Sequence, residues 1–296
     1  MRTSFHSQQM MRHCALLYEL KKNRDLGSVE EYVEEDKEAN VDLGYGRSIG
    51  VGFQELLRTR DLDAAIFKAA CSYSFWESDK KCFEGIVAAL QMLKQEFPLQ
   101  LYHLVLEEAA VKIRLSEEDW WCGFIDGVLF REDTGQYVIG EVKSCGQNGD
   151  NLAPLYQNSG QALGYSVVLP TLLGEDKRAL AGFEVLYLIA HIPGQQWLPK
   201  IKSYLFQKTA LDRKRWLLAL YLDYEQYCRY KELGFWPPRG DSCMSYNRPC
   251  ELFGICGNIN PVDYPPKPKD KIDLITEWDV DVDIQTLIEN ERQYSD

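Results

Sequence analysis

The chain has 296 residues, 45% of them hydrophobic, and a formal net charge of −12 at pH 7. That apolar content suffices for one core of roughly 200–250 residues, whereas no apolar run reaches the roughly 18 residues of a membrane-spanning helix. The first residues lack the apolar stretch of a secretory signal, so we expect a cytoplasmic protein with no membrane partner. Nine cysteines are many for a reducing compartment, which favours metal ligation or buried thiols over disulfides.

The negative charge is concentrated in two segments. Residues 29–42 and residues 258–296 each carry a net charge of −6, and the body that remains without them is neutral. The charge therefore neither demands nor excludes a basic groove for nucleic acid. The basic residues between Lys200 and Arg215 are candidates for contacts with DNA phosphates, although such a run is more often a solvated helix face.

Hydrophobic periodicity and turn residues predict the following elements in chain order. The N-terminal part is expected to hold a helix over 3–25 capped by Thr3 or Ser4, a solvated acidic loop over 27–42, and helical sequence over 46–97 that Pro98 ends. The middle is expected to hold a strand from Leu104 to Leu115, a hairpin over 122–143, a helix over 153–169 with Pro154 in its first turn, and strands over 183–191 and 197–206 paired around Pro193-Gly194. A helix over 209–233 follows, closed by Pro237-Pro238.

This order of elements predicts an α/β fold in a single domain over residues 1–260. Residues 1–100 would be mainly helical, 101–206 would form the sheet core, and 207–260 would supply a helix and a cysteine cluster. Residues 261–296 would be an acidic, flexible tail with one short helix near 284–292.

The hairpin is the most informative segment, because it places two carboxylates and a lysine on one face. Alternating apolar and polar residues run into the turn residues 132–135 and then resume. A turn centred on Asp133 and Thr134 pairs residues whose numbers sum to 267, so Asp126 and Glu141 would face each other with Cβ atoms about 5 Å apart. Lys143, two residues beyond Glu141, would project from the same face.

Two facing carboxylates repel unless a cation or a proton lies between them, and a divalent metal ion is the simplest occupant. A register slip of one residue would separate the pair. The alternative is a salt-bridged surface hairpin, which the apolar neighbours Val138, Ile139 and Val142 disfavour.

Cys243, Cys250 and Cys256 are grouped in the sequence, with six and then five residues between them. This spacing differs from the Cys-x₂₋₄-Cys pairs of zinc knuckles. An iron–sulfur cluster commonly takes four thiolates, and Cys14 on the first predicted helix is our candidate for the fourth. Such a cluster would close a very long loop of chain. Four scattered buried thiols are the alternative.

Asp126-Gly-Val, then Gly140-Glu141-Val-Lys143, then Gln161-x-x-x-Tyr165 resemble the PD-(D/E)XK nuclease superfamily in its RecB-like branch. With Cys14 and the Cys243, Cys250 and Cys256 trio, the chain is similar to the iron–sulfur members of that branch, which include small CRISPR-associated exonucleases, their phage relatives and the AddB nuclease domain. The resemblance covers roughly residues 4–257. It implies a restriction-endonuclease-like mixed central sheet flanked by helices, with an N-terminal helical region and a C-terminal segment stapled by a [4Fe–4S] cluster.

The resemblance also implies a role for each matching residue. Asp126, Glu141 and the Val142 carbonyl would bind Mg²⁺ or Mn²⁺, which take oxygen ligands. Lys143 would orient or deprotonate the attacking water, or stabilise charge on the phosphate. Gln161 and Tyr165, one helical turn apart, would contact DNA or order the lysine. A further carboxylate would come from either Glu107 or Glu108.

The implied function is a metal-dependent DNA exonuclease, acting on DNA ends or single strands in DNA processing, recombination or defence. A protein partner in a recombination or CRISPR-adaptation complex would be compatible with it. One departure matters, because RecB-like nucleases often carry Gly-x-x-x-His on an early helix. Here Gly46 is followed by Gly50 at the histidine position, with Gln54 one turn later. The alternative function is therefore a catalytically weak or inactive iron–sulfur module that binds DNA or a protein partner.

Overall fold

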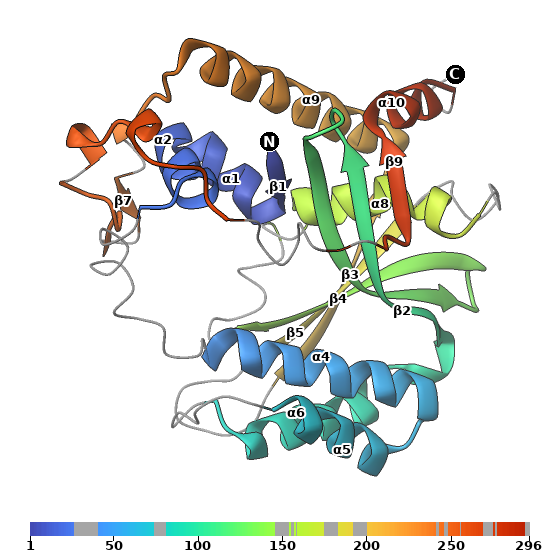
Figure 1. Cartoon of the computed structure of the whole chain (residues 1–296). Coiled ribbons are helices and arrows are strands. Elements are labelled where there is room, and N and C mark those ends of the chain that lie inside the picture. Colours follow the sequence, from blue (N-terminus) through green and yellow to red (C-terminus); the bar gives the residue numbers. More distant parts are fainter. Residues whose placement is uncertain are drawn as a thin grey trace. The chain divides into compact units, whose positions relative to one another are not determined.

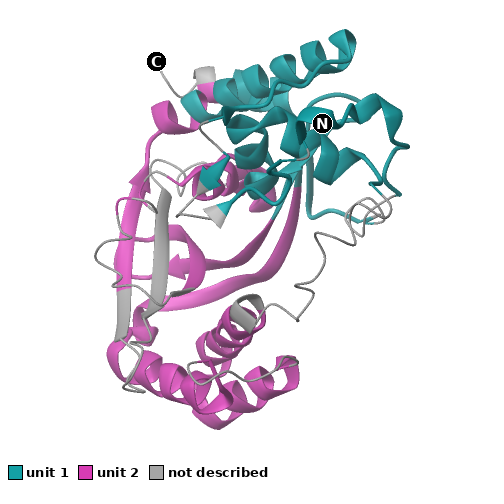
Figure 2. Ribbon diagram, turned by 90° about the vertical axis from the view of Figure 1, so that its left-hand side faces the viewer, with its two compact units in different colours: residues 1–37, 112–123, 215–289 teal, residues 38–111, 124–214, 290–296 magenta. Residues whose placement is uncertain are grey.

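The computed structural model describes residues 1–26, 41–73, 81–145, 154, 157, 159–174, 183–191, 200–240, 243–245, 248–254, 256–268, 275 and 277–293. The chain divides into two compact units, coloured separately in Figure 2. Unit 1 comprises residues 1–37, 112–123 and 215–289, and unit 2 comprises residues 38–111, 124–214 and 290–296. No helix in the described part of the chain is long and apolar enough to cross a membrane.

A mixed β-sheet is the main feature of the fold (Figure 1). Within the described ranges it has seven strands in the order β6-β5-β4-β3-β2-β9, with β1 beside β3. These strands are β1 (Arg2–Ser4), β2 (Tyr102–Arg114), β3 (Trp120–Arg131), β4 (Gln136–Cys145), β5 (Phe183–His191), β6 (Lys200–Lys208) and β9 (Val280–Asp283). β3 and β4 are antiparallel, β4 and β5 are parallel, and β5 and β6 are antiparallel. The predicted mixed α/β fold, with a mixed sheet flanked by helices, is confirmed.

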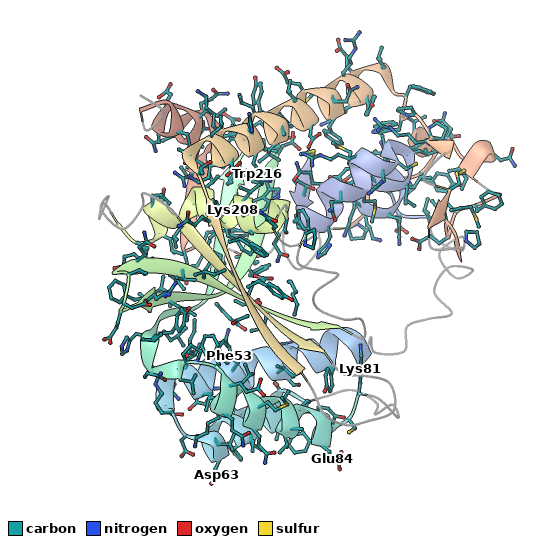
Figure 3. All side chains as sticks on the ribbon, turned by 180° about the vertical axis from the view of Figure 1, so that it is seen from behind. Phe53, Asp63, Lys81, Glu84, Lys208 and Trp216 are labelled. Atoms are coloured by element: carbon teal, nitrogen blue, oxygen red, sulfur yellow. The ribbon has the colours of Figure 1, made fainter. Side chains whose placement is uncertain are left out.

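Unit 2 contains a helical layer, which confirms the predicted N-terminal helical region. Figure 1 shows α4 (Val41–Thr59), α5 (Leu62–Ser72) and α6 (Phe83–Glu96) side by side. Their core includes Phe53, labelled in Figure 3, whose ring meets that of Phe97 edge-on at 5.4 Å. A Cβ at Gly52 would lie 2.8 Å from a methyl carbon of Leu90, so glycine allows α4 and α6 to approach closely. The same core includes Leu129 of β3 and Val138 of β4, which fixes this layer against one face of the sheet.

The hairpin between β3 and β4 has the predicted register. Its ladder runs from Arg131 opposite Gln136 to Gly127 opposite Gly140, and every pair sums to 267. The turn closes with a hydrogen bond from the Gly135 nitrogen to the Arg131 carbonyl, and Gly135 adopts a φ of 65° that favours glycine. Val138 belongs to the core under α4–α6. Alternation therefore places Ile139, Glu141 and Lys143 on the opposite face.

The parallel pair β4 and β5 needs a crossover connection, and α8 (Gly160–Leu172) lies within it. The sequence predicted this helix over 153–169, but α8 begins at Gly160. Of residues 153–159 the structure describes Pro154 and Gln157, which are helical as predicted, and Ser159, which is extended with ψ of 123° and is the N-cap of α8. Pro154 therefore lies before α8. The predicted hairpin of β5 and β6 forms, whereas Pro193-Gly194 lies outside the described residues.

In unit 1, the predicted helix over 3–25 is broken at Cys14. The chain forms α1 (Phe5–His13), α2 (Ala15–Tyr18) and the π-helical turn η1 (Glu19–Asn23). Cys14 itself is extended, with φ of −156° and ψ of 107°, and its sulfur accepts a hydrogen bond from the Leu17 nitrogen at 3.4 Å. The predicted long helix is observed as α9 (Ala210–Leu233). The remaining short elements are η2 (Leu99–Leu101), β7 (Met244–Ser245), β8 (Arg248–Pro249), η5 (Cys256–Asn258) and η6 (Pro261–Asp263).

The acidic tail differs from the expected flexible segment. Residues 280–283 form β9 beside β2, and Ile284–Gln293 forms α10, close to the predicted short helix. The alternation of Val280-Asp-Val-Asp buries the valines, while the carboxylate of Asp281 pairs with Lys112 and Arg114 of β2. Buried Ile284 then begins an apolar helix face. The segment therefore forms a short amphipathic strand and helix despite its high charge.

Candidate active site

The site predicted on the β3–β4 hairpin is assembled within unit 2. Glu141 and Lys143 lie on β4, and the Lys143 ammonium contacts Glu141 Oε1. From α8, Gln161 Nε2 donates to the same Glu141 oxygen at 2.9 Å, and its Oε1 lies 3.4 Å from Lys143 Nζ. Tyr165, one turn along α8, accepts from Gln161 at 3.1 Å and donates to the Phe124 carbonyl at 2.7 Å. One hydrogen-bonded network therefore joins residues that the sequence placed on separate elements.

Glu141 is almost fully buried, with 3% of its surface exposed. Burial raises the pKa of its carboxyl from 4.5 to about 7, against the opposing effect of the Lys143 charge. Its second oxygen, Oε2, is buried and has no hydrogen-bond partner among the described residues. Such an oxygen is costly to leave uncompensated, because it has lost water and gained no donor.

Asp126 faces this network from β3. Its Oδ2 accepts a hydrogen bond from the Val142 nitrogen at 3.3 Å, one residue beyond Glu141. Burial raises the pKa of Asp126, while the charge of Lys143 and the Val142 hydrogen bond act in the opposite direction. The charge of Glu108 raises it further, so these two carboxylates interact electrostatically.

Glu108 reaches the site through an irregularity in β2. Its φ is 40°, an uncommon value for a residue other than glycine, and both Glu107 and Glu108 are exposed where the strand should alternate. Two successive residues on one side of a strand mark a β-bulge, which redirects a side chain. Leu115 and Asp119 pair at the β2–β3 turn, and continuing that register places Glu108 opposite Asp126. Glu107 instead lies 3.7 Å from Arg58, so Glu108 is the stronger candidate for the third carboxylate.

Helix α4 approaches the site at Gln54. Its side-chain amide donates to the backbone carbonyl of Asp126. Gly50 lies one turn earlier, and a Cβ there would meet nothing within 4 Å. Positions four apart share a helix face, so Gly50 and Gln54 lie on the same side of α4. This side of the site therefore has the amide of Gln54 and open space at Gly50.

The donor set suits a hard divalent cation. The carboxylates of Asp126 and Glu141, with Glu108 near them, are the oxygen ligands that Mg²⁺ and Mn²⁺ take, and the unpartnered Glu141 oxygen has the charge to bind one. Among residues whose side chains are described, however, no three Asp, Glu, His or Cys groups are already close enough to hold a metal ion. The residues fit the ion chemically, and the carboxylates would have to draw together around it.

The predicted cysteine ligands lie in unit 1, where they line a single cavity with Leu16, Leu252 and Phe253. β7 and β8 pair Met244 with Pro249, and the same register sets Cys243 opposite Cys250. The Cys250 nitrogen donates to the Cys243 carbonyl at 2.8 Å. Cys14 and Cys256 complete the set, and all four are half-buried free thiols.

This donor set has the composition of an iron–sulfur site, with four thiols against an apolar core. The cavity between them measures about 20 Å³, room for about one water molecule. A cavity of this volume is smaller than a [4Fe–4S] cluster.

The basic residues near 200–215, which the sequence offered as DNA contacts, differ in their exposure. Of the basic residues near 200–215, Lys208 and Arg213 are buried rather than available for DNA, and Arg213 pairs with Glu291 at 2.7 Å. The side chains of Lys200 and Lys202 lie outside the described set. Sequence reasoning did not anticipate the contact of Gln54 with Asp126, nor the exposed Phe124, whose carbonyl accepts a hydrogen bond from Tyr165.

A scan against protein-family models and a search of curated proteins both find no match for this chain.

Proposed function

We propose that this protein is a metal-dependent DNA nuclease of the PD-(D/E)XK type, in the RecB-like iron–sulfur branch, which acts as an exonuclease on DNA ends or single strands. The observation that carries the proposal is the buried carboxylate of Glu141. One of its oxygens is contacted by Lys143 and Gln161, and the other lacks a hydrogen-bond partner among the described residues. A divalent cation shared with Asp126 would compensate that oxygen.

The residues of the site divide the chemistry between them. When bound, Mg²⁺ or Mn²⁺ would supply Lewis-acid polarisation of the phosphate and a more acidic water. Asp126 and Glu141 would hold the ion, with Glu108 and the Val142 carbonyl as further oxygen donors. Lys143, held beside Glu141 and Gln161, would stabilise negative charge on the phosphate.

Tyr165 positions the network rather than transferring protons. Burial and the nearby charge of Glu141 both raise the pKa of its hydroxyl, so it remains a neutral donor at physiological pH. Its hydrogen bonds to Phe124 and from Gln161 tie α8 to β3. Gln161 is thereby oriented toward Glu141 and Lys143.

The test is cleavage of DNA by the full-length protein. Single- and double-stranded DNA labelled at either end is incubated with Mg²⁺ or Mn²⁺, and the release of nucleotides from an end is followed. We expect cleavage that is lost in Lys143→Ala and kept in Lys68→Ala, an exposed lysine on α5 of the same unit. Wild-type protein that cleaves no faster than Lys143→Ala would refute the nuclease proposal.

A second candidate function is a weak or inactive nuclease-fold module that binds DNA or a protein partner, for example in a recombination or CRISPR-adaptation complex. The open space at Gly50 favours it, because the expected histidine ligand is missing. Two results together would support this second function. The protein would cleave DNA with neither Mg²⁺ nor Mn²⁺, and Asp126→Asn and Glu141→Gln would bind DNA as tightly as wild type does.

The iron–sulfur part of the proposal has its own measurement. Protein purified without oxygen is expected to contain about four iron atoms per chain, the number in a [4Fe–4S] cluster. Cys14→Ser or Cys250→Ser should lower the iron content, whereas Cys71→Ser, at an exposed cysteine of α5, should not. Iron content that Cys14→Ser leaves unchanged would remove Cys14 from the ligand set.

A further inference from the structure

Unit 1 contains a large pocket that the proposed active site does not use. Its volume is about 630 Å³, within the usual range for sites that take a nucleotide-sized ligand. The wall comes from β1 and the start of α1, from η1, from the β2–β3 turn and the start of β3, from α9 and from the segment after η6.

The pocket is positive in a chain that is strongly negative. Among the described residues that line it, six are basic, namely Arg2, Lys21, Lys22, Arg24, Lys231 and Lys267, whereas three are acidic. One of the acids, Glu19, is buried and already bonded to Arg24 and Asn23. Another, Asp119, contacts the amino group of Met1. Two of the bases are paired as well, Arg24 with Glu19 and Lys21 with Glu251, which lies outside the pocket lining. Apart from these pairs the lining carries Arg2, Lys22, Lys231 and Lys267 against Glu118, so its charge is positive on balance.

The rest of the wall offers neutral donors and an aromatic surface. Ser4 and Ser7 contribute hydroxyls, which can donate to phosphate oxygens. The ring of Trp120 contacts two cations, because the Arg2 guanidinium lies 4.8 Å and the Lys112 ammonium 5.0 Å from its centroid. Its indole nitrogen is buried without a hydrogen-bond partner in the described part of the chain.

We propose that this pocket binds a nucleic-acid strand through the phosphates of one or two nucleotides. Cations distributed along a wall suit a phosphate backbone, because binding of a strand needs positive charge at several successive points. The pocket would be a second DNA-binding site in addition to the hairpin site. The inference rests on the proposed nuclease function for the choice of DNA as ligand.

The experiment measures binding of a labelled single-stranded oligonucleotide by fluorescence anisotropy, using the full chain and EDTA so that no cleavage occurs. Lys22→Gln combined with Lys231→Gln removes two exposed charges from the pocket. Lys68→Gln combined with Lys94→Gln removes two exposed charges of unit 2 and serves as the matched control. Each phosphate contact contributes about 0.7 to the slope of log affinity against log salt, so the pocket variant should lose about 1.4 of slope and roughly tenfold in affinity.

The outcomes separate the possibilities. Equal affinities and slopes for the pocket and control variants would overturn the inference. The second overturning outcome is a small-anion site. In that case a free mononucleotide or pyrophosphate stabilises wild type but not the pocket variant, while the pocket variant binds the strand as well as wild type does. Strand binding that needs the pocket in a protein that never cleaves DNA would leave this inference standing and remove the nuclease proposal alone.

Discussion

Replacing Glu141 with glutamine should change how the stability of the metal-free protein depends on pH. The pKa of Glu141 rises from 4.5 to about 7 on folding, so the folded state holds the proton more tightly than the unfolded state. The contribution of this group to stability is therefore fully present below pH 4.5 and is lost as the pH rises through about 7. One pKa unit corresponds to about 1.36 kcal/mol. The unfolded and folded pKa values of Glu141 together predict that the free energy of unfolding falls by about 2 kcal/mol between about pH 5.5 and about pH 8.

The assay is urea unfolding of wild type and Glu141→Gln at both pH values, in EDTA. Glutamine keeps the shape of the side chain and cannot ionise, and Asp126, whose pKa burial also raises, is present in both proteins. The difference between the two proteins therefore reports the titration of Glu141 together with its electrostatic coupling to Asp126. Wild type should lose about 2 kcal/mol more than the variant on going to the higher pH.

Metal should reverse this loss. At high pH, Mg²⁺ or Mn²⁺ at a hundredfold excess over its dissociation constant should add about 2.7 kcal/mol to the stability of wild type, and little to that of Glu141→Gln. Parallel pH profiles for the two metal-free proteins would refute the reasoning, because they would mean that the Glu141 carboxylate is not desolvated in the folded state.

Further predictions concern the ligands around this carboxylate and the folded tail. Glu108→Gln should weaken Mn²⁺ binding roughly tenfold in calorimetry, whereas Glu107→Gln should leave it nearly unchanged, because Glu107 lies near Arg58. Equal effects of the two substitutions would refute the assignment of Glu108 as the third carboxylate. Gly50→His should tighten Mn²⁺ binding, because a side chain there meets open space on the face of α4 that carries Gln54; unchanged or weaker affinity would show that position 50 does not reach the metal. Glu291→Ala should lower the free energy of unfolding in urea by about 3 kcal/mol, since it removes the carboxylate that pairs with the buried Arg213 guanidinium. Glu289→Ala, at an exposed position, should change it by less than about 0.5 kcal/mol, and similar values for both variants would contradict the buried pair.

The part of the site that the sequence predicted depends on local rules. A polar four-residue turn between alternating strands sets the register of an antiparallel pair, and the observed ladder has the predicted sum of 267. Glu141 and Lys143 share a strand face for the same reason. Their contact with Gln161 lies beyond such rules, because it depends on how α8, which connects β4 to β5, packs against the sheet. The motif resemblance supplied this contact.

The features that the sequence could not predict depend on partners far away in the chain. The helix over 3–25 has continuous helical periodicity, yet the backbone becomes extended at Cys14, which then lines a cavity with Cys243, Cys250 and Cys256. The bulge at Glu107 and Glu108 needs β3 as a reference strand before it can be recognised. Two adjacent glutamates in an apolar strand were a usable signal, since one of them must leave the regular alternation or lie against the core.

The glycine at position 50, where the motif resemblance implies a histidine, bears on which metal the proposed site would prefer. The candidate ligands around Asp126 and Glu141 are all oxygen donors, and Gln54 uses its amide nitrogen to hold the Asp126 backbone. Imidazole nitrogen suits transition metals, whereas carboxylate, carbonyl and water oxygens suit Mg²⁺ as well as Mn²⁺. Glycine at position 50 offers no nitrogen ligand and leaves open space, where a water molecule of the kind that Mg²⁺ tends to retain would fit. An all-oxygen site of this kind should support turnover with Mg²⁺ about as well as with Mn²⁺, and Gly50→His should shift that balance toward Mn²⁺.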